Sequence, residues 1–121
     1  MRLEHVNLTV SDLDRSIAFY CDLLDLTVRW KGPIDEERLG AHVGDDRSYL
    51  ALFQASAAGS VDLDYDRPGL NHFGFVVDDL DEARRRVEQL GATVHRDADY
   101  KPGRRIYFLD PDGHEVELVQ Y

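Results

Sequence analysis

The chain has 121 residues, of which 43% are hydrophobic and 31% charged, a composition typical of one globular domain and unlike that of disordered chains. Its 24 acidic residues outnumber the 14 basic ones and give a formal net charge of −10, which disfavours nucleic acid and anionic membrane surfaces as partners. The single cysteine, Cys21, excludes an intramolecular disulfide, and we interpret it as a buried apolar thiol.

No apolar run approaches the roughly 20 residues that a membrane-spanning helix needs. The first five residues alternate polar and apolar types, without the apolar segment of a secretory signal. We therefore expect a cytoplasmic protein with no nucleic-acid and no membrane partner.

Two stretches of the sequence repeat one another. Residues 3–14 and 70–81 align at a constant offset of 67 residues (72 − 5), which places His5 on His72. Apolar residues alternate with other types at positions 6, 8 and 10 and again at 73, 75 and 77, which predicts a half-buried strand in each copy. Both histidines then point away from the strongly apolar face that would pack on a helix.

Each predicted strand runs into a helix signal. Ser11 with Asp14, and Asp79 with Glu82, can accept the unpaired N–H groups of a helix start. Apolar residues follow at helical spacing, at 13, 17, 21 and 24 in the first copy and at 80, 83, 87 and 90 in the second. The sequence therefore predicts one strand and one helix at the start of each copy.

Three shorter strands are predicted after each helix, near residues 27–30, 39–43 and 48–54, and near 93–96, 105–109 and 115–120. Residues 44–46 and 110–113 are typical of hairpin turns, and residues 55–68 are interpreted as a linker. The predicted fold class is α+β. A single domain over residues 1–121 is expected, made of two pseudo-symmetric βαβββ modules, 1–58 and 69–121.

The last strands of the two copies align at an offset of 66 residues (117 − 51), so Ala51 stands where Glu117 stands. If the modules pair about a twofold axis, positions 5, 51, 72 and 117 converge, and three of them carry ligand chemistry: His5, His72 and Glu117. Two imidazoles and one carboxylate suit one divalent ion, with Fe2+ or Mn2+ preferred and Zn2+, Ni2+ or Co2+ possible. A lone strand histidine is more often a hydrogen-bonded group, and it is the repeat that favours a metal site.

The turn at residues 110–113 predicts a hairpin in which Tyr107 faces Glu117. A phenol at this place can donate a hydrogen bond to a metal-bound oxygen or carry a proton, so Tyr107 and Glu117 are the candidate catalytic residues. The alternative is that Tyr107 is an aromatic cross-strand packing partner.

These residues together resemble a known family. The start around His5, with Asp12-Leu-Asp and Phe19-Tyr, the second histidine at 72, and the ending from Tyr107 through Asp-Pro-Asp-Gly-His to Glu117 are similar to the vicinal-oxygen-chelate superfamily. That superfamily includes glyoxalase I, extradiol dioxygenases, fosfomycin-resistance proteins and bleomycin-binding proteins. The resemblance implies a cupped mixed β-sheet with helices on the outside, a divalent ion that binds adjacent oxygens of a small-molecule substrate, and ligands matching His5, His72 and Glu117.

Some residues depart from the family pattern. Glyoxalase I normally has a fourth protein ligand where this chain has Ala51, and Gln54 should point to the other face of its strand unless a bulge intervenes. The basic residue expected ahead of the last hairpin in fosfomycin enzymes is not matched at positions 97–99.

The leading functional hypothesis is an oxidoreductase of the dioxygenase type, because three coordination positions remain open. The acid–base histidine of extradiol enzymes is left unassigned between His42 and His95. Alternatives are a glyoxalase-like lyase or isomerase, in which Glu117 or another base moves a proton, and a fosfomycin- or bleomycin-type resistance protein. A homodimer is expected, because a short chain with a cupped sheet leaves apolar edges and relatives commonly pair across a twofold axis.

Overall fold

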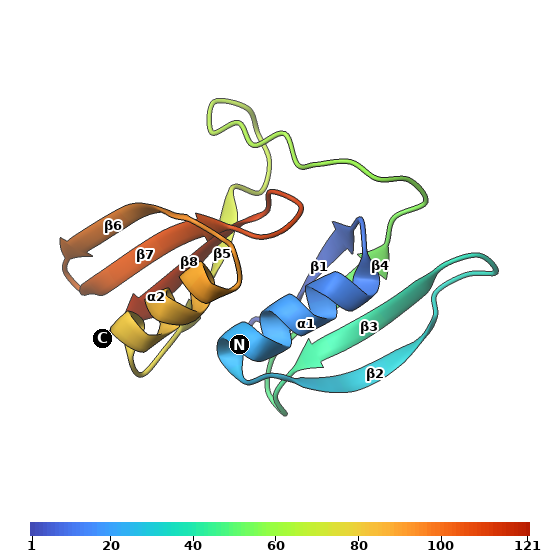
Figure 1. Cartoon of the computed structure of the whole chain (residues 1–121), viewed down its shortest axis with the longest axis horizontal. Coiled ribbons are helices and arrows are strands. Elements are labelled where there is room, and N and C mark those ends of the chain that lie inside the picture. Colours follow the sequence, from blue (N-terminus) through green and yellow to red (C-terminus); the bar gives the residue numbers. More distant parts are fainter. The chain divides into compact units, whose positions relative to one another are not determined.

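The computed structural model describes all residues 1–121 and divides the chain into two compact units, Met1–Gly59 and Ser60–Tyr121 (Figure 1). In the first unit the order is β1 (His5–Val10), α1 (Leu13–Leu24), β2 (Thr27–Pro33), β3 (Leu39–Gly44) and β4 (Tyr49–Gln54). In the second it is β5 (His72–Val76), α2 (Leu80–Gln89), β6 (Val94–Tyr100), β7 (Gly103–Leu109) and β8 (Glu115–Gln120). The α+β class and the repeated βαβββ order are confirmed.

Each unit has its own mixed sheet with the same topology. The strand orders are β1-β4-β3-β2 and β5-β8-β7-β6, four strands in each sheet, with β1 parallel to β4 and β5 parallel to β8. The parallel register pairs Asn7 with Ala51 in the first sheet and Gly74 with Glu117 in the second. Asn7 and Gly74 are repeat partners, so Ala51 and Glu117 occupy equivalent strand positions, as the sequence predicts.

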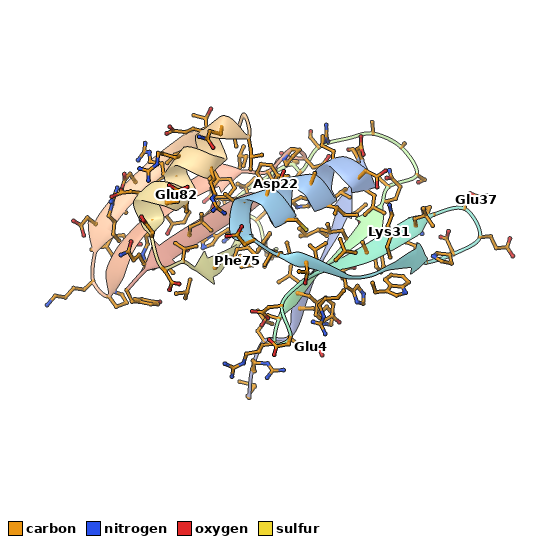
Figure 2. All side chains as sticks on the ribbon, turned by 60° about the horizontal axis from the view of Figure 1, so that its bottom comes forward. Glu4, Asp22, Lys31, Glu37, Phe75 and Glu82 are labelled. Atoms are coloured by element: carbon orange, nitrogen blue, oxygen red, sulfur yellow. The ribbon has the colours of Figure 1, made fainter.

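One face of each sheet is covered by the helix of the same unit. Strand alternation directs one set of apolar residues toward the helix, and these form the two cores, listed here by unit: Leu8, Val10, Leu50 and Leu52; Ile106, Phe108, Val116 and Leu118. Burying one such side chain stabilises the fold by about 1.5 to 3 kcal/mol. The opposite, helix-free face of each sheet carries the polar residues of the same strands. Charged side chains such as Asp22 on α1 and Glu37 between β2 and β3 are exposed (Figure 2).

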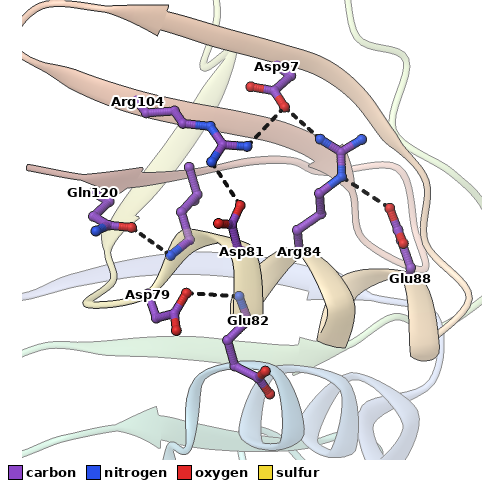
Figure 3. Close-up of polar contacts among 9 residues, drawn as sticks. Asp79, Asp81, Glu82, Arg84, Glu88, Asp97, Arg104 and Gln120 are labelled. Carbon is purple, nitrogen blue, oxygen red and sulfur yellow. Dashed lines mark hydrogen bonds and ion pairs between the residues drawn. The ribbon is translucent and has the colours of Figure 1, made fainter.

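The helix starts differ in part from the predicted ones. Asp12, rather than Ser11, caps α1 by accepting the N–H of Arg15 at 3.1 Å, because α1 begins at Leu13 and Asp12 is the residue before it. The Ser11 hydroxyl instead donates to the carbonyl of Gly59. Asp79 caps α2 as predicted, accepting the N–H of Glu82 at 3.0 Å (Figure 3). Cys21 is half-buried rather than buried, and this burial raises the pKa of its thiol.

Two glutamines at repeat-equivalent positions complete the helix starts. The Gln54 side chain accepts the N–H of Leu13 at 2.8 Å, and Gln120 accepts the N–H of Leu80 at 2.8 Å (Figure 3). The Gln54 amide also donates to the carbonyl of Ser11 at 2.6 Å. Gln54 therefore serves α1 on the helix side of the first sheet and does not project from the helix-free face that carries Ala51.

The outer side of α2 is joined to the second sheet by ion pairs. Asp97 accepts from Arg84 at 2.6 Å and from Arg104 at 3.3 Å, and Arg104 also donates to Asp81 at 2.8 Å (Figure 3). These side chains are part-exposed, so each pair contributes little to stability. Neither helix is long and apolar enough to cross a membrane.

We expect Gln54→Ala to lower the free energy of unfolding by about 1 to 2 kcal/mol, because the substitution removes the acceptor for a helix-start N–H group. Metal affinity should stay unchanged, since Gln54 serves the helix. Denaturant unfolding and metal titration check both parts, with Gln89→Ala, an exposed position on α2, as the control. Weakened metal binding in Gln54→Ala at unchanged stability would contradict this assignment.

Candidate metal centre

The helix-free face of the second sheet holds the candidate site. Glu115 and Glu117 are two residues apart on β8 and therefore project to this face together. The antiparallel register with β7 places Tyr107 directly opposite Glu117, as the predicted hairpin requires. That hairpin closes with the N–H of Asp110 donating to the carbonyl of His114 at 2.8 Å, and Gly113 takes a φ of 90°, which glycine adopts without a side-chain clash.

His72 and Glu117 meet on this face. The Nε2 atom of His72 lies 3.0 Å from Oε2 of Glu117, and Glu117 is only 9% exposed. The other oxygen, Oε1, accepts from Nη1 of Arg105 at 2.8 Å. The second terminal nitrogen of Arg105, Nη2, is buried and has no hydrogen-bond partner in the protein. Both oxygens of Glu117 therefore face a nitrogen, one from β5 and one from β7.

The other ring nitrogen of His72 lies in a second polar group. Its Nδ1 atom is 2.9 Å from the hydroxyl of Tyr65, and that hydroxyl donates to Oε1 of Glu115. Oε2 of Glu115 in turn lies 2.8 Å from Nε2 of His95. Tyr65 and Glu115 were not among the site residues predicted from the sequence, and His95 was named only as one of two possible acid–base histidines. Glu115 could have been found, because strand alternation places it on the same face as Glu117.

Tyr107 is positioned as a hydrogen-bond donor. Desolvation by burial, a hydrogen bond with Tyr100 and the charge of Glu117 raise the pKa of Tyr107 to about 12. Its ring packs edge-on against the His72 ring at 5.5 Å, and the Arg96 guanidinium lies 5.2 Å from its centre. At neutral pH the phenol therefore keeps its proton and does not act as a base.

The first unit presents His5 among aromatic rings. The His5 ring stacks on Tyr49 at 5.1 Å, and Tyr49 stacks on His42 at 4.5 Å. The register pairs His42 with Ala51, just as Tyr107 pairs with Glu117. Nδ1 of His5 lies 2.9 Å from the Glu4 carboxylate. A ligand set that adds His5 to His72 and Glu117 combines residues of both units and stays a prediction.

The donor atoms of the second unit suit a divalent ion. Two ligand atoms that bind one ion at about 2.1 Å and at a right angle lie about 3 Å apart, which matches the 3.0 Å between His72 Nε2 and Glu117 Oε2. Imidazole nitrogen and carboxylate oxygen are ligands common to zinc, iron and manganese sites. These two residues can therefore supply two adjacent ligands of one metal.

A second group with ligand chemistry lies in the β7–β8 turn. Single ligand atoms of Asp110, Asp112 and His114 come within 4.8 Å of one another. However, Oδ1 of Asp110 accepts the N–H groups of Asp112 and His114, both at 2.9 Å. The Asp110 carboxylate therefore has a role in holding the turn, and this role needs no metal ion.

Comparisons with known proteins agree with this fold. A family model described as Glyoxalase/Bleomycin resistance protein/Dioxygenase superfamily matches residues 2–118. The chain is 34% identical over 123 residues to the glutathione transferase FosA of Serratia marcescens, covering 96% of this chain and 78% of that protein. It is also 34% identical over 128 residues to the lactoylglutathione lyase of Salmonella typhimurium, covering 99% and 93%. A glyoxylase/bleomycin resistance protein/dioxygenase domain from Frankia sp. EAN1pec matches with a TM-score of 0.83 at 27% identity, over 99% of this chain and 97% of that one.

The raised pKa of Tyr107 predicts a loss of stability at high pH. The folded-state pKa of Tyr107, about 12, lies above the ordinary tyrosine value of 10.0. The protonated phenol therefore contributes fully to the free energy of unfolding below pH 10, and this contribution is lost as the pH rises toward 12. We expect the free energy of unfolding of Tyr107→Phe to fall less steeply above pH 10 than that of the wild-type chain. Denaturant titrations at a series of pH values measure this, and identical slopes in the two proteins would contradict it.

Proposed function

Because the chain belongs to the Glyoxalase/Bleomycin resistance protein/Dioxygenase superfamily, we propose that it is a metal-dependent enzyme acting on a small substrate through adjacent oxygens. The proposed ligands are His5, His72 and Glu117. The observation that carries the proposal is the pairing of His72 with the buried Glu117 at 3.0 Å. A cytoplasmic location, where thiols stay reduced, is part of the proposal.

Each residue of the site has a distinct proposed task. A divalent ion bound there would supply Lewis acidity toward the oxygens of a substrate. His72 and Glu117 hold their places on β5 and β8, and Arg105 fixes the orientation of the Glu117 carboxylate. The protonated hydroxyl of Tyr107 donates a hydrogen bond to a substrate oxygen and orients it. Mn2+ and Fe2+ are the preferred ions, and Zn2+, Ni2+ and Co2+ are also compatible with these ligands.

Among the family's reactions we favour the addition of a thiol to an electrophilic small molecule. Both relatives named above carry glutathione in their names, one as a transferase and the other as a lyase. Such a transfer requires the enzyme to orient the electrophile and polarise its oxygen. It does not require a protein base that removes a proton from carbon.

The second candidate is a glyoxalase-like lyase, which does need such a base. Both oxygens of Glu117 already face a nitrogen, from Arg105 and His72, and Tyr107 is protonated. Ala51 also stands where glyoxalase-like relatives have a fourth ligand. These observations favour the transferase. The transferase and the lyase reported above give no support to the preference for dioxygenase chemistry, which is not part of the proposal.

We expect the purified chain to bind one equivalent of Mn2+, and His5→Ala, His72→Ala and Glu117→Gln each to weaken binding by at least about tenfold through the loss of a ligand. Isothermal titration measures the affinity, and circular dichroism checks the fold. Glu82→Gln, on the outer side of α2, is the matched control for Glu117→Gln. Full metal affinity in all three ligand variants would overturn the ligand assignment.

The reaction is tested with the Mn2+-loaded chain and three substrates. We expect thiol consumption with fosfomycin and glutathione, and none after chelation of the metal or in Glu117→Gln. Product from the adduct of methylglyoxal and glutathione alone would replace the transferase with the lyase. Oxygen uptake with catechol would restore the dioxygenase, and a chain without metal affinity would be a binding protein.

We also propose a homodimer. β1 and β5 are edge strands, and the repeat-equivalent residues Leu3 and Leu70 before them are 74% and 71% exposed. Exposed apolar residues beside unpaired strand edges favour association with another chain. Light scattering at micromolar concentration should give twice the 13.9 kDa mass of the chain. A monomeric mass would contradict the proposal.

A further inference from the structure

Nδ1 of His72 lies on the side of the ring opposite the atom that faces Glu117, and Tyr65 contacts it there. Tyr65 lies before β5, within residues 55–68, which are predicted from the sequence to be a linker. Its hydroxyl oxygen is 2.9 Å from Nδ1 of His72, and its proton is donated to Oε1 of Glu115. Glu115 is only 7% exposed, and His95 contacts its other oxygen at 2.8 Å. The carboxylate is therefore held from both sides.

Counting protons along this group fixes the state of His72. A tyrosine hydroxyl has one proton, and a carboxylate only accepts. Because the Tyr65 proton is donated to Glu115, the Tyr65 oxygen must accept from His72, so Nδ1 of His72 carries a hydrogen.

The proton on Nδ1 determines what the other ring nitrogen of His72, Nε2, can bind. With the proton on Nδ1, a neutral His72 presents the lone pair of Nε2 toward Oε2 of Glu117 at 3.0 Å. Two acceptors at this distance repel one another unless a cation or an added proton lies between them. A divalent ion satisfies both atoms at once, which is the state that metal ligation by Nε2 requires.

We propose that Tyr65 and Glu115 are positioning residues that fix the tautomer and the ring orientation of His72 for metal binding. The inference rests on the proposed metal site and deepens it, because neither residue is a ligand in the proposed set. A metal-binding histidine usually bonds its second nitrogen to such an outer partner, and loss of the partner typically costs 10- to 100-fold in affinity.

The alternative is that Tyr65 and Glu115 only stabilise the fold. Two variants separate the roles: Tyr65→Phe removes one hydroxyl, and Glu115→Gln keeps the size of the side chain while removing its charge. The matched controls are Tyr121→Phe, at a 73% exposed residue, and Glu88→Gln on the exposed side of α2. Stability is followed by denaturant unfolding, so that a variant that fails to fold is recognised.

The decisive readouts are Mn2+ affinity and the 15N resonances of His72 in the metal-free chain, recorded where the imidazole is neutral. We expect the wild-type ring to be protonated at Nδ1. In Tyr65→Phe the Oε1 atom of Glu115, 3.4 Å from Nδ1, stays as a longer and weaker acceptor, so the balance should shift toward Nε2 and Mn2+ binding should weaken about tenfold. Glu115→Gln leaves a neutral amide oxygen as a weaker acceptor for the Tyr65 proton, so we expect the same two changes at a smaller size. The two control variants should change neither readout.

Unchanged tautomer and unchanged affinity in a folded Tyr65→Phe variant would overturn the positioning role. A merely structural role would lower stability without moving the 15N resonances. If the wild-type chain binds no divalent ion, the proposed function fails. The metal-free spectra would still decide whether Tyr65 and Glu115 set the tautomer of His72, so the two failures are distinguishable.

Discussion

The two-residue alternation of β8 is the constraint on which the rest of the site depends. Val116 and Leu118 face α2 and form the core of the second unit, so Glu115 and Glu117 must project to the helix-free face. The neighbouring strands then fix what Glu117 meets, because β5 brings His72 and β7 brings Tyr107 and Arg105. A shift of β8 by one residue would bury both carboxylates under the helix and expose the core.

The same backbone carries different chemistry in the two units. Gln54 and Gln120 each accept the N–H of the first residue of a helix, so the two units have the same hydrogen bond on the helix side of their sheets. On the helix-free side the pair His42 and Ala51 corresponds to Tyr107 and Glu117. The first unit therefore presents stacked aromatic rings, and the second presents charged groups.

Much of this arrangement could be predicted from the sequence, because period-2 strands, the repeat offset and the hairpin are local patterns. These patterns led to His72, Glu117 and the register of Tyr107. Glu115 was missed although alternation already placed it beside Glu117. Tyr65 could not be found in this way, since it lies in an irregular segment whose path depends on contacts with β5 and β8.

The contact between Arg105 and Glu117 could not be predicted from the sequence. This contact depends on the side-chain rotamers of both residues, which neither the periodic pattern nor the predicted register specifies. The choice among the family's reactions also depends on side-chain contacts that the sequence pattern does not specify. The proposed set of three ligands with open positions is compatible with several chemistries. The contacts of Glu117, the protonated state of Tyr107 and the presence of Ala51 are what favour transfer over proton abstraction in the proposal.

Anomalous scattering from a crystal of the Mn2+-loaded protein would locate the ion. We expect one anomalous peak at about 2.1 Å from both Nε2 of His72 and Oε2 of Glu117. A peak at the turn formed by Asp110, Asp112 and His114, with none at His72 and Glu117, would contradict this expectation.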